Sequence, residues 1–220
     1  LSQYSQRLTR MGEDPMRIYH VGAPGLDNMK HVLTEPRDPQ KYFVATYHPE
    51  TTPDVDYHIL QYQKKRETKK TNADVLALMD ALARFPEYKV YWTGVNNDPG
   101  HKKITATLNY SHQVNWDTEE YLRMCRHATA VIGNSSSFII EAPSLGVPTV
   151  NIGDRQKGRL ISFGTINCRA DADEIENAIK MTFGFGPIRH NHHGGPGASQ
   201  KIASILSGLK LEGIRRKMAA

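Results

Sequence analysis

Three serines and a group of cations lie within one short stretch of this sequence, and together they have the chemistry to bind a phosphate. Residues 130–159 read AVIGNSSSFIIEAPSLGVPTVNIGDRQKGR. Ser135 and Ser136 precede an apolar run, so we expect them to begin a helix whose first N–H groups face an anion. Arg155 follows Gly153, where a guanidinium suits phosphate or carboxylate recognition. A plain helix cap and a surface arginine are the alternatives.

Glu141 follows the first serine by six residues, in a helix that is otherwise apolar. A carboxylate that faces inward needs a hydrogen-bonding partner, because burying an unpaired charge is costly. The two hydroxyls of a nucleotide ribose can both donate to one carboxylate. We therefore expect Glu141 to bind a ribose, and an exposed surface glutamate is the alternative.

Two further polar residues follow strands. His48 lies at the end of a predicted strand, residues 41–49, directly before Pro49. A lone histidine is more often a packed or surface residue, but one at this place is a candidate for phosphate contact or proton transfer. Asn96 opens the turn-rich segment 96–100 after the predicted strand at residues 88–94.

The elements that must position these side chains alternate between strand and helix. Apolar and β-branched runs predict strands at residues 17–22, 41–49, 88–94, 130–132, 149–152 and 166–169. Helices are predicted at residues 1–14, 26–32, 72–85, 100–109, 117–127, 138–144, 172–183 and 198–209. This alternation favours an α/β fold, a Rossmann-like parallel sheet with helices on both faces. Ligands of such sheets bind at the carboxyl ends of the strands, where the candidate residues lie.

Composition excludes several classes of function. The chain has 220 residues, 39% of them hydrophobic and 23% charged, and no apolar run approaches the roughly 18 residues of a membrane span. We expect no membrane association. The net charge is +5, but the basic residues are scattered, so nucleic-acid binding is not expected.

Cys125 and Cys168 form no CxxC pair and no signal peptide is visible, so we expect a cytoplasmic protein with reduced thiols.

A histidine-rich loop near the C-terminus invites a metal interpretation. His190, His192 and His193 lie beside the sequence GGPG and have no acidic or cysteine partners at ligand spacing. We expect a solvated loop, no metal and no cofactor. No GxSxG elbow is present, so a serine hydrolase is not expected.

Four motifs in order resemble one enzyme family. Residues 131–159 are similar to the nucleotide-binding signature of the UDP-N-acetylglucosamine 2-epimerases, particularly the hydrolysing branch of sialic-acid-type pathways. RMGEDPMRIYHVGAPGLDN, FVATYHPETT and the Asn-x-Asp-x-Gly of residues 96–100 resemble three further family segments. The resemblance runs from Arg10 to about Phe183.

The resemblance implies a GT-B fold, in which two Rossmann-like domains hold a UDP-sugar in the cleft between them. This chain resembles only the second. Residues 1–15 would be a helix carried over from a missing first domain, residues 16–185 the UDP-binding domain, and residues 186–220 a loop and terminal helix. The intact enzyme would be a homo-oligomer.

The resemblance also implies roles for individual residues. Ser135 and Ser136 would hold the phosphates and Glu141 the ribose. Arg155 would close over the nucleotide. His48 would face the diphosphate and sugar, and Asn96 would line the same pocket.

The family's reaction converts UDP-GlcNAc and water to N-acetylmannosamine and UDP, by elimination of UDP and then hydration. Its acid and base carboxylates lie in the first domain, so we expect these 220 residues alone to bind UDP weakly and to turn over little or no substrate. A related UDP-amino sugar is an alternative substrate. A stand-alone UDP or UDP-sugar binding module and half of a GT-B glycosyltransferase are alternative functions.

Two positions depart from the family pattern. Phe138 stands where members have a glycine, and a ring at the start of the helix would narrow the approach of a phosphate. Residues 189–195 replace the family's Gly-Asp-Gly before the terminal helix, so the surroundings of that helix are expected to differ.

Overall fold

A parallel sheet forms the centre of the computed structural model, which describes residues 2–50, 60–108, 113–186 and 188–209. Within these ranges the strands are β1 (Gln40–Thr46), β2 (Lys89–Thr93), β3 (Gln113–Val114), β4 (Ala128–Gly133), β5 (Thr149–Ile152) and β6 (Thr165–Cys168). Their order is β3-β2-β1-β4-β5-β6, and every neighbouring pair is parallel. This is the strand order of the Rossmann fold, in which the chain changes direction between β1 and β4.

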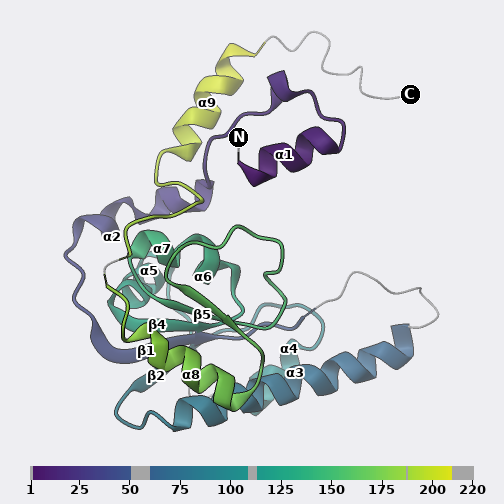
Figure 1. Cartoon of the computed structure of the whole chain (residues 1–220), viewed down its shortest axis with the longest axis vertical. Coiled ribbons are helices and arrows are strands. Elements are labelled where there is room, and N and C mark those ends of the chain that lie inside the picture. The colour runs from purple at the N-terminus through teal and green to yellow at the C-terminus, as the bar shows by residue number, and fades with distance from the viewer. Residues whose placement is uncertain (1, 51–59, 109–112, 187, 210–220) are drawn as a thin grey trace.

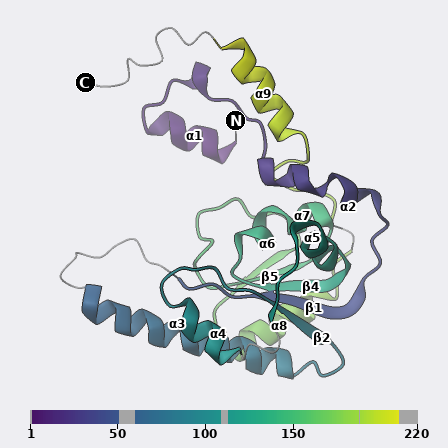
Figure 2. The ribbon, with the colours of Figure 1, turned by 180° about the vertical axis from the view of Figure 1, so that it is seen from behind.

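Helices cover both faces of the sheet (Figure 1 and, from behind, Figure 2). The helices α3 (Leu60–Ala83), α4 (His101–Thr107) and α8 (Ala172–Thr182) pack with the sheet in one hydrophobic cluster. The segments on the other face are η2 (Pro24–Met29), α2 (Lys30–Thr34), α5 (Thr118–His127), α6 (Ser136–Ile140) and α7 (Ala142–Leu145). Two separate apolar cores, one on each face, confirm the predicted α/β architecture with helices on both sides.

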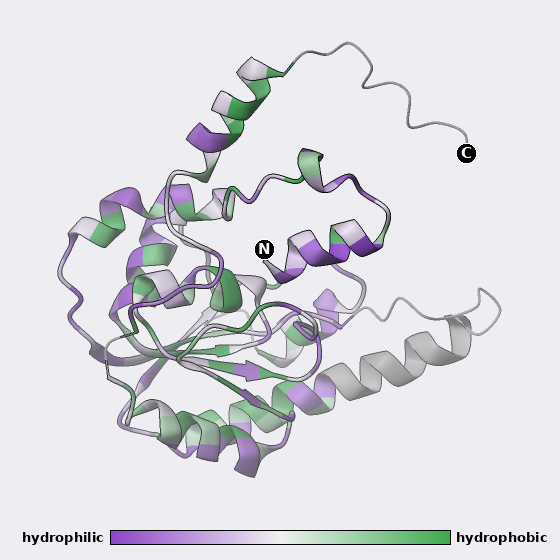
Figure 3. Ribbon diagram, turned by 45° about the horizontal axis from the view of Figure 1, so that its top comes forward, coloured by the Kyte–Doolittle hydropathy of each residue, from purple (hydrophilic) through white to green (hydrophobic). Residues whose placement is uncertain are grey.

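Three segments lie beyond the helix layer on the face of the sheet that α6 and α7 cover: α1 (Gln3–Arg10), η1 (Pro15–Arg17) and α9 (Ala198–Gly208). Asp27 anchors α9, because its carboxylate accepts hydrogen bonds from the backbone N–H groups of Gly197, Ala198 and Ser199. A hydrogen bond from the Ser199 side chain, together with these backbone bonds, holds the pKa of Asp27 below its ordinary value. Figure 3 shows hydrophobic residues along one side of α9, and Leu206 on this helix is exposed. No described helix is long and apolar enough to cross a membrane.

The predicted strand at residues 17–22 is wrong. Arg17 ends the 3-10 helix η1, and the residues after it pair with no strand. Alternating side chains suggested a strand there, but the segment runs beside α9, away from both edges of the sheet, and Tyr19 is exposed. The other predicted strands are confirmed with shifted boundaries, and so are the predicted helices except two: residues 26–32 are divided between the 3-10 helix η2 and α2, and residues 138–144 between α6 and α7. The two-residue strand β3 was not predicted, and α3 begins twelve residues before its predicted start.

Gly133 lets the ends of β1 and β4 approach each other closely. Its φ is +140°, and a Cβ atom there would lie 1.8 Å from the carbonyl oxygen of Thr46. The next residue, Asn134, donates its backbone N–H to that same oxygen at 3.1 Å. Only glycine fits this contact, which places the loops after β1 and β4 side by side.

Candidate functional site

Asn134 joins three loops at the point where the strand order reverses. Its side-chain Oδ1 accepts from the backbone N–H of His48 at 2.7 Å, and its Nδ2 donates to the carbonyl of His48 at 2.9 Å. Its own carbonyl accepts from Gln156 Nε2 at 2.7 Å and from Arg155 Nη1 at 3.2 Å. Asn134 is fully buried. The loops that follow β1, β4 and β5 are therefore fixed to one another at the carboxyl ends of the strands, which we call the rim of the sheet.

The hydrogen bonding of His48 defines its protonation. Its ring Nδ1 accepts the backbone N–H of Asn96 at 3.2 Å, so in the neutral ring the proton lies on Nε2. Burial and, to a smaller extent, the positive charge of Arg155 lower the pKa of His48 to about 4, against a smaller opposite effect of Asp98. At neutral pH His48 is an uncharged hydrogen-bond donor through Nε2.

Arg155 is held at the rim by one ion pair besides its bond to Asn134. Its Nη2 lies 3.8 Å from Asp98 Oδ2, and that carboxylate also accepts from Asn96 Nδ2. The other side-chain polar atom of Asn96, Oδ1, is buried and has no hydrogen-bond partner within the described residues. A cation and an open acceptor are therefore placed together, and Asp98 is a member of the site that the sequence analysis did not single out.

The serines occupy the start of α6. Ser135 is the residue before the helix, yet its hydroxyl forms no cap, and in the part of the chain that the structure describes neither Ser135 nor Ser136 uses its hydroxyl in a hydrogen bond. The predicted helix at residues 138–144 is two short helices, α6 and α7, which meet at Glu141. Phe138 is buried in the apolar cluster of this face, so its ring does not lie across the start of the helix.

Glu141 belongs to a chain of hydrogen bonds. The Tyr121 hydroxyl donates to Ser137 Oγ at 2.8 Å, and Ser137 in turn donates to Glu141 Oε2. Glu141 Oε1 lies beside the backbone of Gly25, 3.5 Å from where a Cβ would stand. Burial raises the pKa of Glu141. The carboxylate faces inward, as predicted, and Ser137 and Tyr121 are partners that the sequence did not reveal.

A cavity of about 310 Å³ opens beside His48. Its lining comes from the ends of β1 and β2 and from the start of α5: His48, Thr93, Gly94, Val95, Asn96, Asn115, Trp116 and Tyr121. Two aromatic rings and few charges suit a planar, largely apolar group. Tyr121 lies within the predicted helix at residues 117–127, and nothing in the sequence marks it as a site residue.

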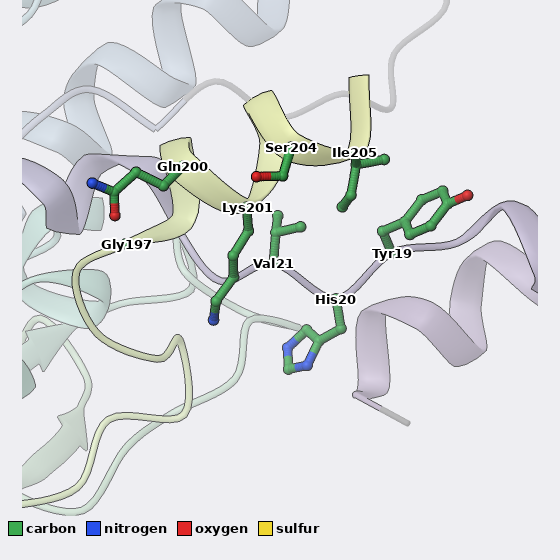
Figure 4. A pocket seen from close by; sticks show the side chains of 8 residues that line it. All are labelled: Tyr19, His20, Val21, Gly197, Gln200, Lys201, Ser204 and Ile205. Carbon is green, nitrogen blue, oxygen red and sulfur yellow. The ribbon is translucent and has the colours of Figure 1, made fainter. Parts of the chain in front are cut away.

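Two larger cavities lie elsewhere. One of about 540 Å³ lies near Asp74 and Arg169, and one of about 560 Å³ separates α9 from residues 19–21. Figure 4 shows the second, with Lys201 of α9 and His20 among its side chains. Neither contains a predicted site residue. The smaller cavity is the better candidate because His48 and Asn96 line it and Arg155 pairs with the Asp98 carboxylate that Asn96 holds.

The histidine-rich loop is only partly the solvated loop that the sequence suggested. His190 and His192 are exposed, but His193 is 9% exposed and donates from Nε2 to the carbonyl of Leu160 at 3.0 Å. That prediction is wrong for His193, because the neighbouring Asn191 ties the loop to α6 through the carbonyl of Ile140. No group of three metal-binding side chains occurs among the described residues.

Curated proteins similar to this chain include sugar-nucleotide enzymes. "Polysialic acid biosynthesis protein P7" of Escherichia coli is 28% identical over 197 residues, which cover 82% of this chain and 47% of that protein. "GDP/UDP-N,N'-diacetylbacillosamine 2-epimerase (hydrolyzing)" of Campylobacter jejuni is 28% identical over 196 residues, which cover 80% and 47%. The chain spans about half the length of the curated relatives it matches.

Solved structures and a family model agree on the fold. UDP-GlcNAc 2-epimerase of Methanocaldococcus jannaschii, crystallised with UDP-GlcNAc and UDP, is 15% identical with a TM-score of 0.63, over 92% of this chain and 58% of that one. This likeness confirms a Rossmann-like domain of the kind found in GT-B proteins. The family model described as UDP-N-acetylglucosamine 2-epimerase matches residues 1–207. The chain therefore belongs to the UDP-N-acetylglucosamine 2-epimerase family.

Proposed function

We propose that this chain binds UDP and a UDP-linked amino sugar, as the nucleotide-binding half of a hydrolysing UDP-N-acetylglucosamine 2-epimerase. The observation that carries the proposal is the group formed by His48, Asn134 and Arg155 at the reversal of strand order. It places a guanidinium and an imidazole N–H where a Rossmann-like sheet binds its ligands.

The diphosphate belongs beside this group. Arg155 offers a charge-assisted hydrogen bond, and His48 offers Nε2–H without adding a competing charge. The hydroxyls of Ser135 and Ser136, which form no hydrogen bond within the described residues, can donate to the same ligand. Asp98 pairs with Arg155, so a bound diphosphate would compete with a carboxylate for this cation.

The nucleoside fits between Glu141 and the cavity beside His48. Tyr121 lines that cavity and is linked to Glu141 through Ser137, so a base against Tyr121 and Trp116 brings its ribose toward the carboxylate. Ribose hydroxyls would donate to Glu141 as Ser137 does now. Uracil, a single planar ring, suits a cavity of about 310 Å³.

The reaction we propose is elimination followed by hydration. A base takes the proton from C2 of the sugar while the C1–O bond breaks and UDP leaves, which gives a 2-acetamidoglucal. Water then adds its hydroxyl at C1 and a proton at C2 from the opposite face, so N-acetylmannosamine and UDP are the products. Arg155, His48 and the serines stabilise the departing diphosphate.

We propose that the C2 base is not supplied by the described part of this chain. His48 and Tyr121 are the titratable side chains that line the cavity, but Nδ1 of His48 is occupied by Asn96 and its Nε2 carries the proton, while burial raises the pKa of Tyr121. We therefore propose that the catalytic carboxylates lie in a first domain, and that residues 16–185 form the UDP-binding domain while residues 1–15 and 186–220 adjoin its partner. We propose GlcNAc or a di-N-acetylated relative as the sugar. The second alternative is included because the Campylobacter protein is named for a di-N-acetylated sugar.

Calorimetric titration of the chain with UDP, UMP and UDP-GlcNAc tests the proposal. UDP should bind more tightly than UMP, because the second phosphate adds contacts with Arg155 and the serines. Arg155→Ala and Ser136→Ala should weaken UDP binding by about 10- to 150-fold, since each charge-assisted contact is worth about 1.5 to 3 kcal/mol. Arg169→Ala, the same change at the exposed end of β6, is the matched control and should bind UDP as the unchanged chain does.

Unchanged UDP affinity in both site variants would contradict the assigned site. Turnover of UDP-GlcNAc by the chain alone at ordinary enzyme rates would contradict the part of the proposal that places the base in another domain.

A further inference from the structure

Leu160 is held at both of its backbone polar groups by side chains from distant parts of the chain. It lies in the loop between β5 and β6, which also carries Arg155. Its N–H donates to the hydroxyl oxygen of Tyr4, in α1, at 3.0 Å. Its carbonyl accepts from His193 Nε2 at 3.0 Å. The two ring centroids are 6.1 Å apart, so Tyr4 and His193 form one clamp around a single peptide residue.

His193 is itself fixed from several sides. Its backbone N–H donates to Asn191 Oδ1 at 2.9 Å, and its carbonyl accepts the N–H of Ala23 at 3.1 Å. Asn191 Nδ2 donates to the carbonyl of Ile140 at 2.7 Å, at the end of α6. Burial lowers the pKa of His193, which keeps the ring neutral with its proton on the nitrogen that faces Leu160. Asn191 therefore links the clamp to α6, the helix that begins at the candidate serines.

The clamped loop has a second anchor at the site. Gln156 and Arg155 both donate to the carbonyl of Asn134. Between the two anchors the backbone turns tightly, because Lys157 N–H donates to the carbonyl of Asp154 at 2.9 Å and Arg159 N–H to that of Gln156 at 3.1 Å. These tight turns leave little slack between Leu160 and Arg155, so the fixed position of Leu160 limits where the Arg155 backbone can lie.

We propose that His193 and Tyr4 are positioning residues, which hold the loop of residues 153–164 so that Arg155 faces the diphosphate. The proposal rests on the proposed UDP site and extends it, since it assigns a role in nucleotide binding to α1 and to the histidine-rich loop. Neither residue contacts the nucleotide. Their effect is on the orientation of Arg155, and it is exerted through Leu160.

Substitution of His193 separates this role from plain packing. His193→Phe keeps a ring beside Tyr4 but removes the donor to Leu160, whereas His193→Gln retains an N–H at a similar distance along the side chain. In calorimetric titrations His193→Phe should weaken UDP binding by about 5- to 20-fold, and His193→Gln should restore it to within about threefold of the unchanged chain. His190→Phe, at an exposed position of the same loop, is the matched control.

A double-mutant cycle shows whether the effect passes through Arg155. In the Arg155→Ala background His193→Phe should cost less than about twofold, because the group that it positions is gone. Tyr4→Phe removes one oxygen and should weaken UDP binding in the same direction, so it carries the test if His193→Phe does not fold. UDP affinity equal to that of the unchanged chain in both His193→Phe and Tyr4→Phe overturns the proposal.

Amide hydrogen exchange tests the clamp independently of nucleotide binding. His193→Phe and Tyr4→Phe should speed exchange at Leu160 and at residues 155–159, while His190→Phe should not. Unchanged exchange in the first two variants overturns the clamp. Faster exchange in a chain that binds no UDP would refute the proposed function, and the clamp would then have no nucleotide-positioning role.

Discussion

The neutral state of the half-buried His48 ring predicts a defined loss of stability in acid. His48→Asn is the perturbation that isolates it, because the asparagine Oδ1 can still accept the backbone N–H of Asn96 while the residue no longer titrates. The backbone bonds between His48 and Asn134 are unaffected by the substitution. The variant therefore keeps the local geometry and removes only the proton binding.

The size and sign of the effect follow from the pKa. The pKa of His48 is about 4 in the folded chain against an ordinary value of 6.5. Between these values the unfolded chain binds a proton that the folded chain does not, so the free energy of unfolding falls as the pH drops from about 6.5 to about 4. The full shift corresponds to about 3.4 kcal/mol, and because the ring is only half-buried we expect about 1 to 2 kcal/mol.

Urea unfolding followed by circular dichroism at about pH 7 and about pH 4.5 measures this difference. The unchanged chain should lose about 1 to 2 kcal/mol more than His48→Asn between the two pH values. Other titrating groups, including His193, whose pKa is also lowered by burial, are present in both proteins and cancel in the comparison. The same loss in both proteins would refute the neutral, Nε2-protonated state of His48 and with it the donor role assigned to this ring.

Two further substitutions test the packing at the rim and the ribose contact. Gly133→Ala should destabilise the chain by about 3 kcal/mol or more in urea unfolding, because the added Cβ would meet the Thr46 carbonyl. Gly12→Ala is the control and should cost about 1 kcal/mol, since nothing lies within 4 Å of its added Cβ. Equal costs for the two substitutions would refute the close contact at Gly133. Glu141→Gln should weaken UDP binding by about tenfold in calorimetry but barely alter the binding of 2′,3′-dideoxy-UDP; equal losses for the two nucleotides would contradict the ribose contact.

The sequence was informative about the fold wherever a strand contains a run of apolar or aromatic residues. The strands β1, β2, β4 and β5 read as apolar or aromatic runs because helices cover both faces of the sheet. The two-residue strand β3 is too short to leave a pattern. Residues 17–22 alternate like a strand, but alternation alone does not supply a neighbour, and here the neighbour is the helix α9.

For the site, the sequence indicated the chemistry of each residue better than its contacts. His48, Asn96 and Arg155 were found because each follows a strand of a parallel sheet, and the structure brings them together. The central role of Asn134 depends on a buried amide that bonds both backbone groups of His48, and a Gly-Asn turn gives no sign of it. His193 looked solvated for the same reason, since its partner lies 33 residues away in sequence.

A crystal structure of the chain with UDP tests the central claim most directly. The diphosphate should lie within hydrogen-bonding distance, about 2.7 to 3.2 Å, of the Arg155 guanidinium and of His48 Nε2. The uracil should occupy the cavity beside Trp116 and Tyr121, with the ribose at Glu141. A nucleotide bound elsewhere, for example between α9 and residues 19–21, with the rim of β1 and β4 empty, would contradict the account.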